Sequence, residues 1–176
     1  MKKIFLALAA LATLTFVSCE KKDVGGTEVK DMSGEWYVHI VAIDENGAPL
    51  YGGDDPFEFG PFILLTYNDA ANNGDKLFIQ DTPNADGEYF WEFQVKANCN
   101  TGDNTFSVKG GEDLVYGISI DITNGKVLYG AATTPSGQPA DSITMDILFE
   151  DDENAGVYYD RLRFTGYRYT GLVADE

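Results

Sequence analysis

The stretch Ser33-Gly34-Glu35-Trp36-Tyr37-Val38-His39-Ile40 marks the start of the folded domain. From Trp36 onward, side chains alternate with period 2, as in a β-strand with one buried face. Trp36, Val38 and Ile40 share one face, and His39 lies on the other. The residues before this stretch, 20–31, show no periodic apolar pattern and are expected to form a flexible tether.

Segments with the same alternation follow, separated by Gly, Pro, Asn and Asp. Asn46-Gly47 and Asn124-Gly125 are the clearest turn signals, because both residue types accept positive φ. Residues 48–59 hold two Pro and two Gly and predict a long loop of the kind that often carries function. The expected strands are 35–43, 62–67, 76–80, 88–97, 105–109, 115–123, 126–133, 142–150 and 157–170.

These segments predict an all-β domain over residues 32–176. No stretch after residue 32 has the period of an amphipathic helix. Antiparallel strands joined in sequence suit an up-and-down barrel of about 8 to 10 strands. A β-sandwich is the alternative, because one apolar face per strand suits both architectures.

The N-terminus resembles a bacterial lipoprotein signal. Lys2-Lys3 is followed by an apolar segment, Ile4 to Val17, that is too short to span a bilayer. Val17-Ser18-Cys19 resembles a lipobox, in which the cysteine is diacylated and becomes the new N-terminus. We therefore expect a signal peptide over 1–18, lipidation of Cys19, a tether over 19–31 and an anchor in the outer membrane, on its surface or its periplasmic face.

Charge and cysteine content exclude several functions. The formal net charge is −17, and loss of Lys2 and Lys3 with the signal peptide makes it −19. Such a charge argues against nucleic acid or anionic lipid as a partner. Solubility explains the acidic residues, with calcium binding by acidic loops as the alternative. Cys99 is then left alone, and we expect it to be a structural thiol.

No catalytic motif is present. The single histidine, His39, faces outward by strand parity, and there is no Gly-x-Ser-x-Gly elbow or zinc spacing. Asp121 and Asp146 fall on polar faces, where solvated carboxylates are expected. Asp160 falls on the apolar parity of its strand, but one inward carboxylate is not the pair that glycoside chemistry needs.

Several short segments together resemble the Bacteroidota lipoproteins known as lipid-binding putative hydrolases. They are Met32 to Val38, Thr66 to Ala71, Asp141 to Ile143 and Phe164 to Gly171. The resemblance implies a lipocalin-like barrel, as does the Gly34-Glu35-Trp36 opening. In such barrels the Trp closes one end and a basic side chain of the last strand packs across it. Arg168, which shares the apolar parity of its strand, is expected to close the barrel end with Trp36.

The apolar faces of the middle strands are the expected ligand site. We expect a small hydrophobic or amphipathic ligand, such as a lipid, to contact Trp91, Phe93, Ile120, Met145 and Ile147, with Tyr129 and Asp160 as orienting polar groups. No cofactor or metal is expected. The alternatives are a hydrolase of unknown substrate, as the resemblance implies, or an accessory surface lipoprotein whose barrel is filled by its own side chains.

Overall fold

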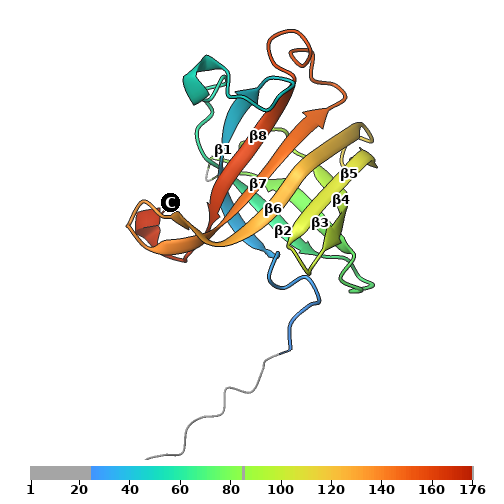
Figure 1. Ribbon diagram of the computed structural model, residues 1–176, viewed down its shortest axis with the longest axis vertical. Helices are drawn as coiled ribbons and strands as arrows, with labels where there is room; N and C mark the ends of the chain where they lie inside the picture. Colours follow the sequence, from blue (N-terminus) through green and yellow to red (C-terminus); the bar gives the residue numbers. More distant parts are fainter. Residues whose placement is uncertain (1–24, 85, 176) are drawn as a thin grey trace, which may run out of the picture.

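The computed structural model describes residues 25–84 and 86–175, which form a closed barrel (Figure 1). Neighbouring strands are antiparallel, and β8 pairs with β1. The predicted all-β up-and-down barrel is confirmed, and the sandwich alternative is wrong because one sheet closes on itself. The strands are β1 (Gly34–Ile43), β2 (Phe62–Asn68), β3 (Lys76–Thr82), β4 (Gln94–Asn100), β5 (Thr105–Glu112), β6 (Ser119–Thr133), β7 (Pro139–Phe149) and β8 (Arg161–Arg168).

β1 has the predicted alternation. Trp36, Val38 and Ile40 are buried, and His39 is exposed. The chain just before β1 also belongs to the core, because Val29 is buried with the barrel's apolar side chains although it lies within the expected tether. The alternation of apolar residues therefore predicts which face of β1 is buried. The core also includes residues before β1, which the alternation does not predict.

The closure between β1 and β8 depends on Gly166. It pairs with Val38, and the strands lie so close there that a Cβ on Gly166 would collide with the Tyr37 carbonyl. The pairing continues without a bulge to Arg168, which lies opposite Trp36. Inward parity is therefore kept to the end of β8.

Asn124-Gly125 is not a turn, and this prediction is wrong. The two residues lie inside β6, where the register with β7 shifts between Thr123 and Lys126. Asn124 has a φ of 55°, and a Cβ on Gly125 would collide with Phe106. A β-bulge, like a turn, favours Asn and Gly because these residues accept a positive φ. The expected strands 115–123 and 126–133 are therefore one strand, β6, and the barrel has eight strands rather than nine.

Two other expected strands are shorter than the alternation implied. β4 begins only at Gln94, because the backbone N–H groups of Trp91 and Glu92 donate to Asp81 Oδ2 and Glu92 has a φ of 45°. β8 begins only at Arg161. Asp160 is consequently exposed, and its predicted inward orientation is wrong.

The up-and-down order gives the barrel two different ends. The connections β1–β2, β3–β4, β5–β6 and β7–β8 gather at one end, which we call the loop end. The start of β1, the end of β8 and the remaining connections lie at the other, the terminal end (Figure 1). Within the described residues, no helix has the length and hydrophobicity of a membrane span.

Candidate functional site

The barrel interior is filled. Phe93, Ile120, Met145 and Ile147 face inward as predicted, but each is at most 1% exposed and all belong to one continuous apolar cluster. Protein interiors of this kind leave few voids larger than a water molecule. A guest among these four side chains would have to displace them.

Tyr129 does not face a ligand site. It is 59% exposed and lies in the half of β6 nearer the terminal end. The register between β6 and β7 shifts again between Leu128 and Ala132, so the simple alternation does not continue through this part of the strand. Tyr129 and Asp160, the two expected orienting groups, both point to solvent.

A cluster of aromatic rings covers the interior at the loop end. Phe90, from the β3–β4 connection, is its centre, with ring centroids 5.5 Å from Phe57, 5.2 Å from Phe62 and 5.7 Å from Phe164. We call this cluster the aromatic plug; its members are Phe57, Phe59, Phe62, Phe90, Trp91, Phe149 and Phe164. Trp91, a predicted ligand residue, stacks on Phe149 at 4.7 Å and is part of the plug.

Asp81 holds the plug from inside the barrel. It lies on the inward parity of β3 and is 1% exposed. Its Oδ2 accepts hydrogen bonds from the backbone N–H groups of Trp91 and Glu92, at 2.9 and 3.2 Å, while Oδ1 has no hydrogen-bond partner among the described residues. Burial raises the pKa of Asp81, against the opposing effect of these backbone N–H groups.

A groove with aromatic walls lies beside the plug. It has a volume of 560 Å³ and separates the β1–β2 connection from the β7–β8 connection. We call it the aromatic groove; it is lined by Tyr51, Asp55, Pro56, Phe57, Glu58, Asn154, Tyr158 and Tyr159. Its size lies within the range of sites that bind small molecules.

Hydrogen bonds hold the two walls of the groove. Tyr51 donates its hydroxyl to the Tyr158 carbonyl at 2.9 Å, so it joins the two connections. Tyr159 donates to Asp152 Oδ2 at 2.7 Å, and burial together with this bond raises the pKa of the Tyr159 hydroxyl. Phe57 contacts the Tyr159 ring edge-on at 6.2 Å, so the groove borders the plug directly.

The backbone of the groove is strained. Tyr51 and Glu58 have φ values of 51° and 54°, in the left-handed region that residues other than Gly, Asn and Asp seldom adopt. Such strain costs about 1 to 3 kcal/mol per residue and is found most often at functional sites. The three asparagines with positive φ, at positions 72, 104 and 124, belong to a residue type that tolerates it.

Exposed apolar side chains also gather at the loop end. Of the eleven large hydrophobic residues described as exposed, seven lie on its connections. They are Tyr51, Tyr89, Leu114, Val115, Tyr116, Val157 and Tyr158. The loop end therefore differs in chemistry from the outer wall of the barrel.

The terminal end is closed by polar contacts around a tryptophan. The Arg168 guanidinium lies 4.3 Å from the Trp36 ring centroid, and it also bonds Asp141 at 3.1 Å. Trp36 donates its indole N–H to Thr66 at 2.8 Å. Gly34 leaves room for this arrangement, because a Cβ there would collide with the Arg168 guanidinium.

Comparison with models of protein families finds a match over most of the chain. Residues 21–173 match the model of the family described as "Lipid-binding putative hydrolase". The chain belongs to this family. A search of curated proteins found no match. A closed β-barrel that belongs to a lipid-binding family fits a lipid-binding protein.

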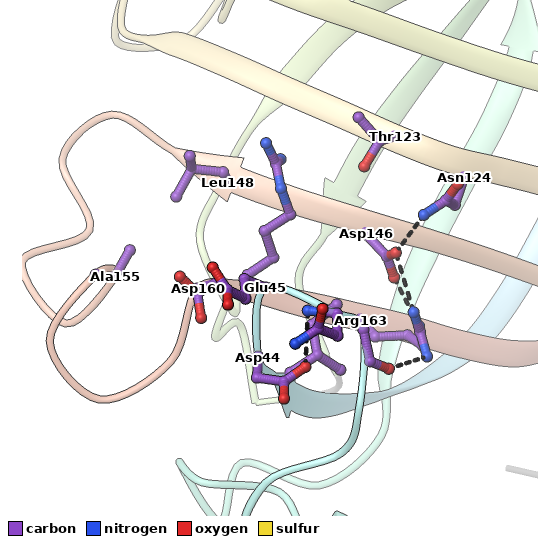
Figure 2. A pocket seen from close by; sticks show the side chains of 14 residues that line it. Asp44, Glu45, Thr123, Asn124, Asp146, Leu148, Ala155, Asp160 and Arg163 are labelled. Carbon is purple, nitrogen blue, oxygen red and sulfur yellow. Dashed lines mark hydrogen bonds and ion pairs between the residues drawn. The ribbon is translucent and has the colours of Figure 1, made fainter.

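The hydrolase part of the family description makes a cleft lined by carboxylates a candidate active site. This cleft, of 620 Å³, lies on the outer wall between the β1–β2 turn and strands β6 to β8 (Figure 2). We call it the outer-wall cleft. Asp44, Glu45, Asp146 and Asp160 contribute carboxylates, and Thr123 and Asn124 contribute further polar groups.

The most buried carboxylate of this cleft is fully engaged. Asp146 accepts Arg163 Nε at 2.6 Å and a terminal nitrogen of Arg163 at 3.0 Å, and Asn124 at 2.7 Å (Figure 2). Burial alone would raise the pKa of Asp146, but the bonds from Arg163 and Asn124 outweigh it and lower the pKa. Arg163 also donates to the Gly47 carbonyl at 3.1 Å, so the group fastens the β1–β2 turn to the barrel wall.

Among the described residues, the other candidate groups have no activating partner. His39 is exposed, as its parity predicted. Cys99 is partly buried, and burial and the charge of Asp75 raise the pKa of its thiol, which disfavours the thiolate. No cluster of three His, Cys, Asp or Glu in the described part of the chain could hold a metal ion. Cys19 lies outside the described residues.

Sequence reasoning missed the aromatic groove. Tyr51 and Tyr158 are 107 residues apart in the chain and meet only through the fold. The long Pro- and Gly-containing segment 48–59 is predicted to be a loop, but strand alternation gives no role to its aromatic residues. Aromatic residues at several positions of polar connections were the available signal.

Proposed function

We propose that the protein is a lipid-anchored lipoprotein of the outer membrane that binds a small amphipathic, lipid-like ligand in the aromatic groove. The gathering of Tyr51, Phe57, Tyr158 and Tyr159 around a 560 Å³ groove carries the proposal. Family membership supports a lipid as the ligand class. The resemblance of Val17-Ser18-Cys19 to a lipobox supports the anchor.

The groove is a better site than the barrel interior for physical reasons. Tyr158 is 64% exposed, so a ligand can gain contact area there without displacing the core. Burial of apolar surface stabilises by about 25 cal/mol per Å². A ligand chain could extend from the groove toward the interior only by displacing Phe57 and its neighbours in the plug.

A neutral fluorescent apolar probe, N-phenyl-1-naphthylamine, tests the site. We expect the probe to bind at about one per chain, and Tyr158→Ser to weaken binding about five- to tenfold. Tyr129→Ser is the matched control, because Tyr129 is similarly exposed at 59% but lies toward the terminal end of β6 and does not line the groove. It should leave the probe affinity unchanged.

Two results would contradict this proposal. Absence of probe binding would favour an accessory lipoprotein with a filled barrel. Probe binding that is insensitive to Tyr158→Ser but altered by Met145→Leu, a change of similar volume inside the barrel, would place the ligand among the core side chains instead.

A further inference from the structure

The charged residues that line the aromatic groove all carry one sign. Asp55 and Glu58 are the only ionisable acids or bases among its eight lining residues, apart from the tyrosine hydroxyls. Neither forms an ion pair with a lysine or arginine in the part of the chain that the structure describes. The groove therefore combines aromatic rings with uncompensated negative charge.

The geometry keeps this charge at the groove wall. Asp55 accepts the backbone N–H groups of Phe57 and Gly60, at 2.9 and 3.0 Å, which fixes its carboxylate to the β1–β2 connection. Glu58 is exposed. Its backbone is in the left-handed region, which glutamate seldom adopts. The Glu58 backbone is strained, although its carboxylate makes no hydrogen bond within the described structure. This combination indicates that the carboxylate contacts a ligand rather than stabilising the fold.

Aromatic rings next to carboxylates have a specific ligand preference. The faces of Tyr and Phe rings attract ammonium groups, and a nearby carboxylate adds Coulomb attraction. An anionic head group would be repelled by the same carboxylates and by the net charge of −17. A neutral head group would gain only the apolar contacts.

We propose that the aromatic groove selects a cationic group, so that its ligand is an amphiphile with an ammonium head beside an apolar chain. This inference rests on the proposed function, because it names the ligand class of the same groove. The ammonium could belong to a lipid head group or to a free alkylammonium compound. Both sources share the chemistry that the groove recognises.

Displacement of N-phenyl-1-naphthylamine by four dodecyl amphiphiles of equal chain length tests the selectivity. These are dodecyltrimethylammonium, dodecylphosphocholine, dodecyl maltoside and dodecyl sulfate, each below its micelle-forming concentration. We expect the trimethylammonium compound to bind about tenfold more tightly than the maltoside, and the sulfate most weakly. If the phosphocholine matches the trimethylammonium compound, a lipid head group is the favoured source; if it is weaker, a free alkylammonium is favoured.

Glu58→Asn isolates the charge from the backbone. Asparagine tolerates positive φ, so the loop keeps its conformation while the carboxylate is lost. We expect this variant to bind the trimethylammonium compound about three- to tenfold more weakly and the maltoside unchanged. Asp54→Asn is the control, because Asp54 is an exposed acid of the same connection that does not line the groove.

The outcomes separate this inference from the proposed function. If the neutral probe and all four amphiphiles bind without regard to head group, the inference is wrong and the proposed function stands. If Glu58→Asn weakens all four equally, Glu58 shapes the loop and the charge has no role, which also overturns the inference. If neither the probe nor any amphiphile binds, the proposed function fails and the inference fails with it.

Discussion

Arg168 has two physical roles that its position in β8 brings together. It is a cation over the Trp36 ring, and it is a hydrogen-bond donor to the Asp31 carbonyl at 2.9 Å and to the Ser33 carbonyl. Strand parity predicts the first role, because a cation on an apolar face needs a partner. The hydrogen bonds to Asp31 and Ser33 depend on the path of the chain just before β1, and strand alternation does not predict that path.

A double-mutant cycle measures the ring contact alone. We expect Trp36→Leu and Arg168→Gln to be coupled by about 1 to 2 kcal/mol in urea unfolding, because the ring is buried and the cation partly desolvated. Lys96 and Phe78 form the control pair, at 4.9 Å with Lys96 largely exposed. Their coupling should be about 0.5 kcal/mol or less. Additive effects at Trp36 and Arg168 would show that the contact does not stabilise the fold.

At the scale of elements, Asp146 joins three parts of the barrel. We expect Asp146→Asn to destabilise the protein by about 1 to 3 kcal/mol at pH 7, because Arg163 loses a charged partner. The lowered pKa of Asp146 means that its contribution is present above the unfolded value near 4 and is lost as the pH falls through the folded value. Urea unfolding of wild type and variant between pH 2 and 7 tests this, with the exposed Asp160→Asn as a control that should stay within about 0.5 kcal/mol.

Asp81 should show the opposite pH dependence. Its pKa is raised in the folded state, so the folded protein binds the proton more tightly than the unfolded chain. Its contribution to stability is therefore greatest when the carboxyl is protonated, and it falls as the pH rises from about 4 through the folded pKa. We expect wild type to gain stability relative to Asp81→Asn on acidification. A difference that is constant between pH 4 and 7, or that shrinks on acidification, would contradict this assignment.

The same elements show how far the sequence leads. Alternation identifies six of the eight strands within a few residues and predicts an all-β domain, because each strand needs one dry face. The barrel itself is indicated by the Gly34-Glu35-Trp36 opening. Alternation fails before Gln94, because hydrogen bonds from the Trp91 and Glu92 backbone to Asp81 keep this segment out of the strand. It also fails at Asn124-Gly125 in β6, where residues typical of a turn form a bulge. The groove could not be predicted, since Tyr51 and Tyr158 meet only when the barrel closes.

On the scale of the whole molecule, the up-and-down order sets the direction in which the site faces. β1 starts at the terminal end (Figure 1). The aromatic groove lies at the loop end, because residues of the β1–β2 and β7–β8 connections line it. A chain anchored before β1 would therefore carry the groove at the end of the barrel farthest from its attachment.

Replacement of each cysteine in turn tests the anchor. We expect Cys19→Ala to move the protein from the membrane fraction to the soluble fraction, because the proposed acylation of Cys19 would supply the attachment. Cys99→Ala, the matched control, changes a partly buried thiol of β4 and should leave the protein in the membrane fraction. Because the groove lies at the end opposite to the start of β1, loss of the anchor should not change the affinity for N-phenyl-1-naphthylamine. Retention of Cys19→Ala in the membrane would place the anchor elsewhere, and a loss of probe affinity on release would show that the bilayer helps to form the site.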